Sequence, residues 1–450
     1  MHLELGTFPV KEVAFDTRTH LAGGILRVNP DEISSIVLED ERIKKVKIEV
    51  VRPSENARIL YLRDVVEPRI KVEGPGNVFP GILGGVDVVG SGKTHRLAGV
   101  AVMESVRTPE ALFDTPELTE DQQLRTNADD SFLDMAGPGA LSLFTETINI
   151  VLCLKLKEGL RVRDFAKAVQ ISGLRVAAYL AETARGRSAP RIEVFDDEQA
   201  DSSLPGVVYI HAVRGAGLHH VAGVGLGYPR GPEFYGLRIS DGFLTFVHPT
   251  ELLDGALVED GWVSGDRLTT WENLNNPIIL DLLRRHGKDV NFRGMILMYI
   301  RYTQFQEKES AACQAAKLAK RLGADGAIIT WHRAGNAFVE PMLTLQECEK
   351  IGIKAVLVTN ELGETEDEPP LLYYSPLAQT IISTGGKGRP TNLPRVERVV
   401  GGDALWLHRE AGGSPIPAKG EVAALPDGLG FPSPGLGHYY GFTKRRCFEY

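Results

Sequence analysis

The sequence has few cysteines and no closely spaced pair of them. The four cysteines are Cys153, Cys313, Cys348 and Cys447, and the absence of a C-x-x-C pair argues against a zinc site or a redox dithiol built from them. Cys153 lies inside the apolar run INIVLCLKL and is most simply a small buried hydrophobic residue. The chain has no cysteine between Cys153 and Cys313, and the functional prediction depends on this absence.

Long apolar runs are also missing, and the basic runs KTHRLAG and TKRRC are short and are read as solvated surface. No run reaches the roughly 18 apolar residues that a membrane-spanning helix needs, and MHLELGTFPVKEVAF at the N-terminus lacks the basic and apolar regions of a signal peptide. The net charge of -9 argues against a surface that binds nucleic acid. We therefore predict a cytoplasmic protein without disulfides that binds neither nucleic acid nor membranes.

The length of 450 residues exceeds what one hydrophobic core usually supports, so more than one domain is expected. Residues 1–285 read mainly as short strands and predict a sheet-rich α+β domain, with an acidic surface loop inserted at about 105–134. Residues 286–401 alternate strands with helices, which predicts a doubly wound parallel α/β domain. The predicted fold class is therefore α/β.

Two helices stand out in this pattern, and the C-terminal part has a different composition. An amphipathic helix is expected from about Arg163 to Arg185, and a second helix, KESAACQAAKLAKRLG, ends at Gly323 as its C-terminal cap. Residues 402–450 are rich in glycine and proline but contain seven large aromatic groups, which are too many for a free linker. We predict an extended arm packed on the rest of the molecule or on a partner. The seven aromatic residues are Trp406, Phe431, Tyr439, Tyr440, Phe442, Phe448 and Tyr450.

Four segments resemble the component B proprotein of glycine, sarcosine and betaine reductases, to which the D-proline reductase proprotein is related. They are KVEGPGNVFPG (71–81), VGSGKTH (89–95), MAGPGA (135–140) and DGALVEDGWVSGDRLTTWENLNNP (254–277). The resemblance implies that a cysteine shortly after a PTE…DGA run marks the point where the chain is cleaved. That cysteine becomes an N-terminal pyruvoyl group, which captures the substrate amine, while a selenocysteine or cysteine subunit performs reductive C–N cleavage.

The cleavage cysteine is missing from this sequence. Its position reads Gly261, Trp262, Val263 and Ser264, and an indole cannot form the thioester that precedes a pyruvoyl group. We therefore predict an uncleaved chain without a pyruvoyl cofactor. Ser264 leaves one alternative open, because serine can also self-process to pyruvoyl through an ester; Thr269 and Thr270 are the other hydroxyl groups near this point.

The run Gly90 to Thr94 mimics the end of a phosphate-binding loop. A complete loop needs a further glycine five positions before Gly92, and this sequence has Asp87 there, whose carboxylate would repel phosphate. The residues that follow have the pattern of a strand. Nucleotide binding is therefore not expected.

One concentrated set of histidine and carboxylate residues is expected to carry the chemistry. Imidazole titrates near neutrality and binds metals, and carboxylates complete such sites. The alternative, histidines in loops with satisfied hydrogen bonds, stays open. The predicted catalytic residues are His219, His248, Glu251, Asp254 and Ser264, and the predicted ligands of a divalent metal such as zinc are His219, His220, His248 and Glu251.

Polar residues that follow the later strands are predicted to bind substrate. Open parallel sheets bind their ligands at the carboxyl ends of the strands, although no G-x-G-x-x-G fingerprint for a dinucleotide is present. The predicted substrate-binding residues are Gly335, Asn336, Glu340, Ser383 and Thr384.

Three functional hypotheses follow. The first is a subunit of a two-component enzyme that hydrolyses a C–N bond of a small amino-acid-like or cyclic amide compound, assisted by a metal or by acid–base groups. The second is a non-catalytic scaffold subunit of a complex that resembles glycine, betaine or proline reductase. The third is a reductase with a serine-derived pyruvoyl group. A second component-B-like subunit is the expected partner.

Overall fold

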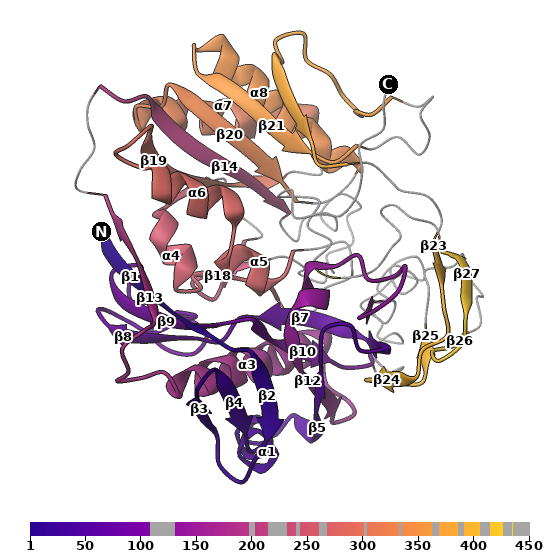
Figure 1. Ribbon diagram of the computed structural model, residues 1–450. Helices are drawn as coiled ribbons and strands as arrows, with labels where there is room; N and C mark the ends of the chain where they lie inside the picture. The colour runs from indigo at the N-terminus through magenta and orange to yellow at the C-terminus, as the bar shows by residue number, and fades with distance from the viewer. Residues whose placement is uncertain are drawn as a thin grey trace.

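The computed structural model describes residues 1–108, 131–197, 203–214, 232–239, 244–260, 268–300, 304–332, 335–361, 369–385, 391–405, 415–425 and 434. Sheets from the first part of the chain form the lower half of the molecule in Figure 1, and a sheet from the later part forms the upper half. Short helices lie between the two halves. Among the helices that the structure describes, none is long and apolar enough to cross a membrane.

Two four-stranded sheets form the lower half, with the orders β13-β1-β9-β8 and β5-β12-β10-β7. Helix α3 (Val162–Glu182) packs against β7, β8 and β10, and α1 (Pro30–Leu38) packs against β5 and α3. The buried apolar side chains of these helices and of both sheets form one continuous core. The strands are β1 (His2–Pro9), β5 (Ile43–Val51), β7 (Leu62–Val66), β8 (Arg69–Glu73), β9 (Gly92–Ala98), β10 (Val100–Ser105), β12 (Ile148–Leu156) and β13 (Arg191–Asp196).

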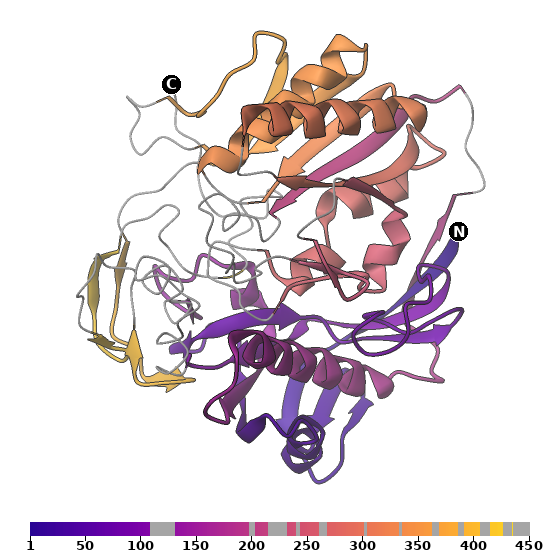
Figure 2. The ribbon, with the colours of Figure 1, turned by 180° about the vertical axis from the view of Figure 1, so that it is seen from behind.

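The upper half is a six-stranded sheet with the order β17-β19-β14-β20-β21-β22, in which only the edge strand β17 runs antiparallel. Helices α7 (Phe305–Arg321) and α8 (Val339–Lys350) cover one face of it, as Figure 2 shows from behind, and α6 (Pro277–Arg285) packs on the other. The strands are β14 (Gly206–Arg214), β17 (Leu244–Val247), β19 (Asn291–Ile300), β20 (Gly326–Trp331), β21 (Lys354–Thr359) and β22 (Thr380–Ser383).

The order of these strands creates a topological switch point. After β14 the chain adds β19 on one side and then returns to add β20, β21 and β22 on the other side. Alternate residues of β14 enter separate cores: Ile210 packs toward α7 and α8, and Tyr209 packs toward α6. Burial on both faces explains why β14 and β19 read as nearly continuous apolar runs. The mixed α/β class and the parallel sheet expected from the sequence are confirmed.

The parallel sheet does not coincide with the domain expected at residues 286–401, because β14 and β17 precede residue 286. The division of the chain into domains stays a prediction. The inserted loop expected at about 105–134 begins and ends in strands, since Ser105 closes β10 and Asp134 closes β11; residues 109–130 lie outside the described part.

Small sheets complete the fold, and some of them contain the later chain. Leu405, Ala418 and Val422 pack in one core with Tyr61 and Phe132, so the described part of the expected C-terminal arm lies on the rest of the molecule. The arm's seven large aromatic residues are outside the described part. The small sheets are β2 (Glu12–Phe15), β4 (Ile25–Val28) and β3 (His20–Ala22); β11 (Phe132–Asp134), β6 (Ala57–Leu60) and β24 (Arg398–Val400); β16 (Leu237–Arg238), β15 (Glu233–Phe234) and β18 (Leu257–Val258); β23 (Thr391–Leu393) and β27 (Val422–Leu425); and β25 (Ala404–Leu405) and β26 (Ile416–Pro417). The short helices are η3 (Leu143–Glu146), α4 (Pro249–Leu253), α5 (Thr270–Leu274) and η5 (Gly335–Phe338).

Candidate functional site

His248 and Glu251, two of the predicted catalytic residues, cap the short helix α4. The His248 N–H donates to Glu251 Oε2 at 2.9 Å, and the His248 ring lies between Thr250 Oγ1, 2.7 Å from Nδ1, and Asp197 Oδ2, 3.1 Å from Nε2. Glu251 Oε1 accepts a hydrogen bond from the Tyr235 hydroxyl at 3.0 Å. Burial lowers the pKa of His248 and raises the pKa of Glu251. Both side chains are therefore engaged in a capping box.

The predicted metal site is only partly visible. His219 and His220 lie outside the described residues. In the part of the chain that the structure describes, no three His, Cys, Asp or Glu side chains are arranged to hold a metal ion. The site of His219, His220, His248 and Glu251 stays a prediction, and a metal ion there would have to displace a partner of the His248 ring.

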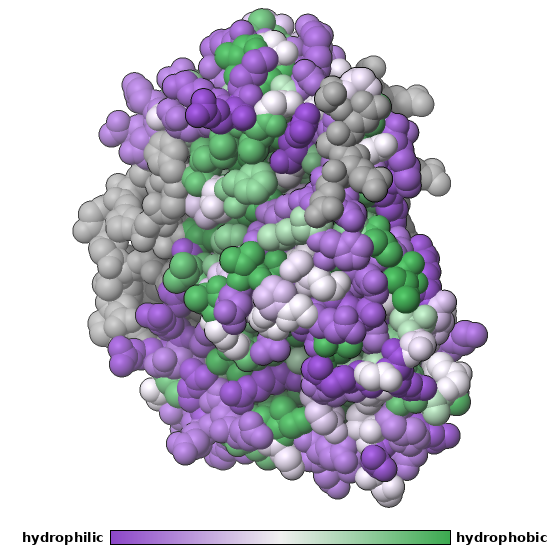
Figure 3. Space-filling model, turned by 90° about the vertical axis from the view of Figure 1, so that its left-hand side faces the viewer, coloured by the Kyte–Doolittle hydropathy of each residue, from purple (hydrophilic) through white to green (hydrophobic). Residues whose placement is uncertain are grey.

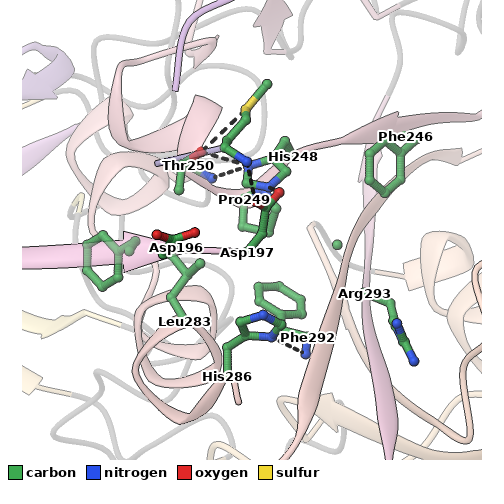
Figure 4. A pocket seen from close by; sticks show the side chains of 13 residues that line it. Asp196, Asp197, Phe246, His248, Pro249, Thr250, Leu283, His286, Phe292 and Arg293 are labelled. Carbon is green, nitrogen blue, oxygen red and sulfur yellow. Dashed lines mark hydrogen bonds and ion pairs between the residues drawn. The ribbon is translucent and has the colours of Figure 1, made fainter. Parts of the chain in front are cut away.

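A pocket of about 350 Å³ lies beside His248, at the amino-terminal end of β19. Leu283, His286 and Phe292 lie along one side of it in Figure 4 and face Pro249 and Asp197. The pocket is therefore at the opposite end of β19 from the carboxyl edge of the sheet.

On the left-hand side of the molecule, apolar side chains gather above the middle of the surface (Figure 3).

Asp254 lies at the meeting point of three of the four segments that carry the family resemblance. Its carboxylate accepts hydrogen bonds from Lys71 Nζ, from Thr94 Oγ1 and from the Gly90 N–H, the last at 2.7 Å. Its backbone oxygen accepts from the Phe79 N–H at 2.8 Å. The predicted catalytic role of Asp254 is untested, and its contacts here are those of a buried structural centre.

The same contacts explain the run that mimics a phosphate-binding loop. The Gly90 N–H, which such a loop would direct at a phosphate, donates to the Asp254 carboxylate instead. The residues from Gly92 onward form β9 rather than a helix. Gly92 has φ +86°, and a Cβ there would lie 2.2 Å from the Glu73 backbone oxygen, so this glycine serves close strand packing.

The predicted cleavage position, residues 261–264 with Ser264, lies outside the described residues, but the chain on both sides of it is described. The Glu259 N–H donates to Thr270 Oγ1 at 2.9 Å. Thr270 in turn donates to Asp64 on β7, from its N–H at 2.8 Å and from its hydroxyl at 2.5 Å. The two flanks are thus joined to each other and to the lower half of the molecule.

Buried carboxyl groups beside this position were missed by the sequence reasoning. Burial raises the pKa of Asp64 and of Glu272 to about 7, and it raises the pKa of Glu104 well above its usual value. Glu104 packs so closely against α3 that a Cβ at Gly173 would lie 2.1 Å from its Oε1. A signal was available, because Asp64 and Glu104 stand inside the apolar strands LRDVV and VAVMES, where burying a charge is costly.

The switch point of the parallel sheet faces the same part of the chain. His332 follows β20 directly, and its Nε2 accepts a hydrogen bond from the Leu268 N–H at 3.3 Å. The backbone N–H of His332 donates to the backbone oxygen of Ala212 on β14 at 2.9 Å. Ligands of open parallel sheets bind outside the carboxyl ends of the strands at such a switch point. The edge where a ligand is expected therefore lies next to the flank of residues 261–267.

A polar network connects β14 and β20 beneath this edge. Thr330 Oγ1 lies 2.5 Å from the Tyr209 hydroxyl and 2.7 Å from His211 Nδ1, and Asn276 Nδ2 donates to the Tyr209 hydroxyl at 3.1 Å. Burial lowers the pKa of His211 to about 3. His211 is therefore neutral at physiological pH and serves as a hydrogen-bonding group rather than a charge.

The predicted substrate-binding residues fall in different places. Gly335 and Asn336 begin η5 after β20, and Asn336 is exposed. Glu340 is completely buried and pairs with Lys308 at 2.8 Å, which joins α8 to α7. Glu340 lies in the first turn of α8, where its carboxylate is engaged in this ion pair, and its predicted role in substrate binding stays a prediction.

Ser383 and Thr384 do lie at the carboxyl edge, at the end of β22. The Ser383 hydroxyl donates to Glu361 Oε1 at 2.5 Å, and the Thr384 N–H donates to the Thr359 oxygen at 2.9 Å. Glu361, which follows β21 and is buried, was not singled out from the sequence. The structure therefore places a buried carboxylate beside Ser383, while the substrate-binding role of Ser383 and Thr384 stays a prediction.

Comparison with known proteins identifies relatives along most of the chain. The family described as glycine/sarcosine/betaine reductase component B subunits matches residues 1–422. The sarcosine reductase complex component B subunit alpha of Peptoclostridium acidaminophilum is 33% identical over 410 residues, which cover 89% of each chain. The glycine reductase complex component B subunits alpha and beta of Acetoanaerobium sticklandii show the same identity and coverage. The betaine reductase complex component B subunit alpha of P. acidaminophilum is 29% identical over 444 residues, covering 94% of this chain and 95% of the relative. No solved structure matches.

Proposed function

Because the chain belongs to the glycine/sarcosine/betaine reductase component B family, we propose that it is a subunit of a reductase complex that acts on a small amino-acid-like amine. The relatives carry the names of reductase complex subunits. They give no support to hydrolysis of a C–N bond, which the sequence placed first, and they favour the reductase alternative.

Within such a complex, the subunit works without a cysteine-derived electrophile of its own. No cysteine stands at residues 261–264, and neither flanking cysteine belongs to this part of the chain. Cys153 lies on β12, where burial raises its thiol pKa to about 11, and a protonated thiol is a poor nucleophile. Cys313 lies on α7. The missing cysteine, in a chain that matches the family over residues 1–422, is the observation that carries the proposal.

The subunit's role is then to hold the partner and position the substrate, while the partner supplies the reactive group. The carboxyl edge of the parallel sheet supports this role, because His332, Ser383 and Glu361 bring hydrogen-bonding groups to the place where such sheets bind ligands. On the lower half, the buried carboxyl group of Asp64 accepts a hydrogen bond from the Thr270 N–H, in the described flank that follows residues 261–267.

Intact mass and activity of the reconstituted complex test the proposal. The purified chain should give one species of 49.2 kDa. With the second component-B-like subunit, the selenocysteine or cysteine subunit and a thiol reductant, it should release the amine from glycine, sarcosine or betaine, and Ser264→Ala should release it equally well. Two fragments that meet between residues 263 and 264, lost in Ser264→Ala, would establish a serine-derived pyruvoyl group instead. Amine release by this chain alone without a reductant would contradict the reductase proposal.

A further inference from the structure

The pocket of about 350 Å³ beside His248 has mostly apolar walls. Phe246 lies along one side of it and is 43% exposed, whereas Phe195 and Phe292 are buried. Gly294 lets Phe246 lie across β19, because a Cβ at residue 294 would be 2.4 Å from the Phe246 ring. Ligand pockets usually enclose about 300–1,000 Å³. This pocket is at the small end of that range and fits a small apolar or aromatic group.

Two hydrogen-bond donors of the residues that line this pocket have no acceptor. The Phe292 N–H donates to His286 Nδ1 at 2.9 Å, so the imidazole ring carries its proton on Nε2. His286 Nε2 and Arg293 Nε are both shielded from water, and neither has a hydrogen-bond partner among the described residues. A donor that is shielded and unpaired costs free energy. Oxygen atoms of a ligand would remove that cost.

The charges that line the pocket leave Arg293 without a counter-charge. Asp197 pairs with the amino group of Met1 and with His248 Nε2, the latter at 3.1 Å. Asp196 is hydrogen-bonded to an imidazole ring at 3.0 Å. In Figure 4, Arg293 lies across the pocket from Asp197. Both acids therefore have partners already, and the charge left for a ligand is the positive charge of Arg293.

We propose that this pocket binds a small carboxylate that carries an apolar or aromatic group. Arg293 and His286 hold the carboxylate, since a guanidinium and an imidazole N–H are both suitable donors to it, and Phe246 and Phe292 contact the apolar group. The pocket lies at the amino-terminal end of β19, away from the carboxyl edge of the sheet where the substrate is expected. It is therefore a second site, and binding there does not depend on the role proposed for the subunit.

Titration of the full-length chain with phenylacetate, followed by ligand-observed NMR, tests the site. Phenylacetate should bind with a Kd of about 1 mM or below, which a ligand of about ten non-hydrogen atoms can reach. Acetate keeps the carboxylate but has no ring, and benzyl alcohol keeps the ring but has no charge. Each should bind at least about tenfold more weakly, because each loses one of the two contacts.

Three variants locate the bound phenylacetate. Arg293→Met removes the charge and should weaken binding at least about tenfold. His286→Asn keeps an acceptor for the Phe292 N–H but removes the Nε2 donor, and it should weaken binding about fivefold. Arg284→Met is the matched control, because Arg284 lies on α6 and pairs with Glu193 at 2.8 Å outside the pocket. It should change the Kd by less than about twofold, since it removes only a distant surface charge.

Phenylacetate binding that is unchanged in Arg293→Met and His286→Asn overturns the site, as does an equal loss in Arg284→Met. Absence of binding to the wild type at about 10 mM ligand also overturns it. Equal affinity for acetate would make the pocket a simple anion site, and displacement of phenylacetate by an equal concentration of betaine would make it a substrate site; either result contradicts the proposal. The melting temperature of each variant is measured alongside. If His286→Asn lowers it, Arg293→Met decides, because the Arg293 Nε has no described partner to lose.

Discussion

Lys71 and Asp254 lie 183 residues apart in the chain and form an ion pair whose side chains are 3% and 0% exposed. Removing one partner of a buried pair leaves an uncompensated charge, which costs roughly 3–5 kcal/mol. Lys71→Met should lower the free energy of unfolding by an amount in this range, measured by urea denaturation. Lys93→Met is the control, because Lys93 pairs with Glu4 at 3.1 Å near the surface, where such a pair contributes about 1 kcal/mol or less. Equal losses in the two variants would contradict the central role of the Lys71–Asp254 pair.

The pKa of Asp64 predicts a pH-dependent stability. Its folded value of about 7 lies above its ordinary value of 3.8, because burial disfavours the charged form. Between these values the unfolded chain has lost the proton that the folded protein keeps, so the contribution of Asp64 to stability falls as the pH rises. The limiting slope is about 1.4 kcal/mol per pH unit. The difference in unfolding free energy between wild type and Asp64→Asn should therefore decrease from pH 5 to pH 7.

The comparison with Asp64→Asn is needed because other buried groups make the stability change with pH in the opposite direction. His211, with a pKa lowered to about 3, contributes stability that is lost as the pH falls below about 6.5. The absolute pH profile therefore mixes both effects. Glu272→Gln should change the profile in the same direction as Asp64→Asn, since burial also raises its pKa to about 7. A difference that is constant across pH 5 to 7 would show that Asp64 is charged throughout.

His248 is predicted to stabilise the start of α4. His248→Ala removes the N-terminal cap and should lower the free energy of unfolding by about 1 kcal/mol, whereas His248→Asn should retain most of it, because asparagine is a good N-cap. Thermal unfolding of the three proteins measures this. Elemental analysis of the same samples separates capping from metal binding. About one equivalent of zinc in the wild type that is absent from both variants would establish the predicted metal site and contradict a role confined to capping.

Gly173 is required by the position of Glu104. Alanine normally stabilises a helix interior by about 1 kcal/mol relative to glycine, but here its Cβ would lie 2.1 Å from Glu104 Oε1. Gly173→Ala should therefore destabilise the protein, and adding Glu104→Ala should recover part of the loss. Chemical denaturation of the four proteins in this cycle should give a coupling energy above about 1 kcal/mol. Additive effects would show that the two residues do not compete for the same space.

Local structure could be predicted from the sequence where periodicity and end signals agree. The helix expected at Arg163 to Arg185 is α3, Val162–Glu182, and Gly323 follows α7 with φ +77°. The partners of β14 and β17 could not be predicted, because pairing between strands far apart in the chain leaves no local pattern. The same limit applies to the site. The run His248-Pro-Thr-Glu251 has the spacing of a capping box, but the sequence alone cannot distinguish a capping box from a pair of catalytic residues with the same spacing.

The contacts of the other site residues also depend on partners that are far away in the sequence. Glu340 reads from the sequence as a polar residue after a strand, yet Lys308, 32 positions earlier, pairs with it. Asp64 and Thr270 are 206 positions apart, and their contact depends on how α5 reaches β7. The carboxyl edge could be predicted because parallel strands bring their ends together whatever residues follow them. Ser383 and Thr384 do lie at this edge, although their role in substrate binding stays a prediction.

The hydrogen bonds that meet at Asp254 lie apart from the position where the relatives' cysteine is expected. Three of the four segments that carry the resemblance are held together by Lys71, Gly90, Thr94 and the turn that contains Asp254. None of these contacts involves the residue at the position of the missing thiol. A substitution at residues 261–264 therefore leaves these contacts intact. The motifs that identify the family can persist in a chain that lacks the cysteine, because they hold the fold together at a separate place.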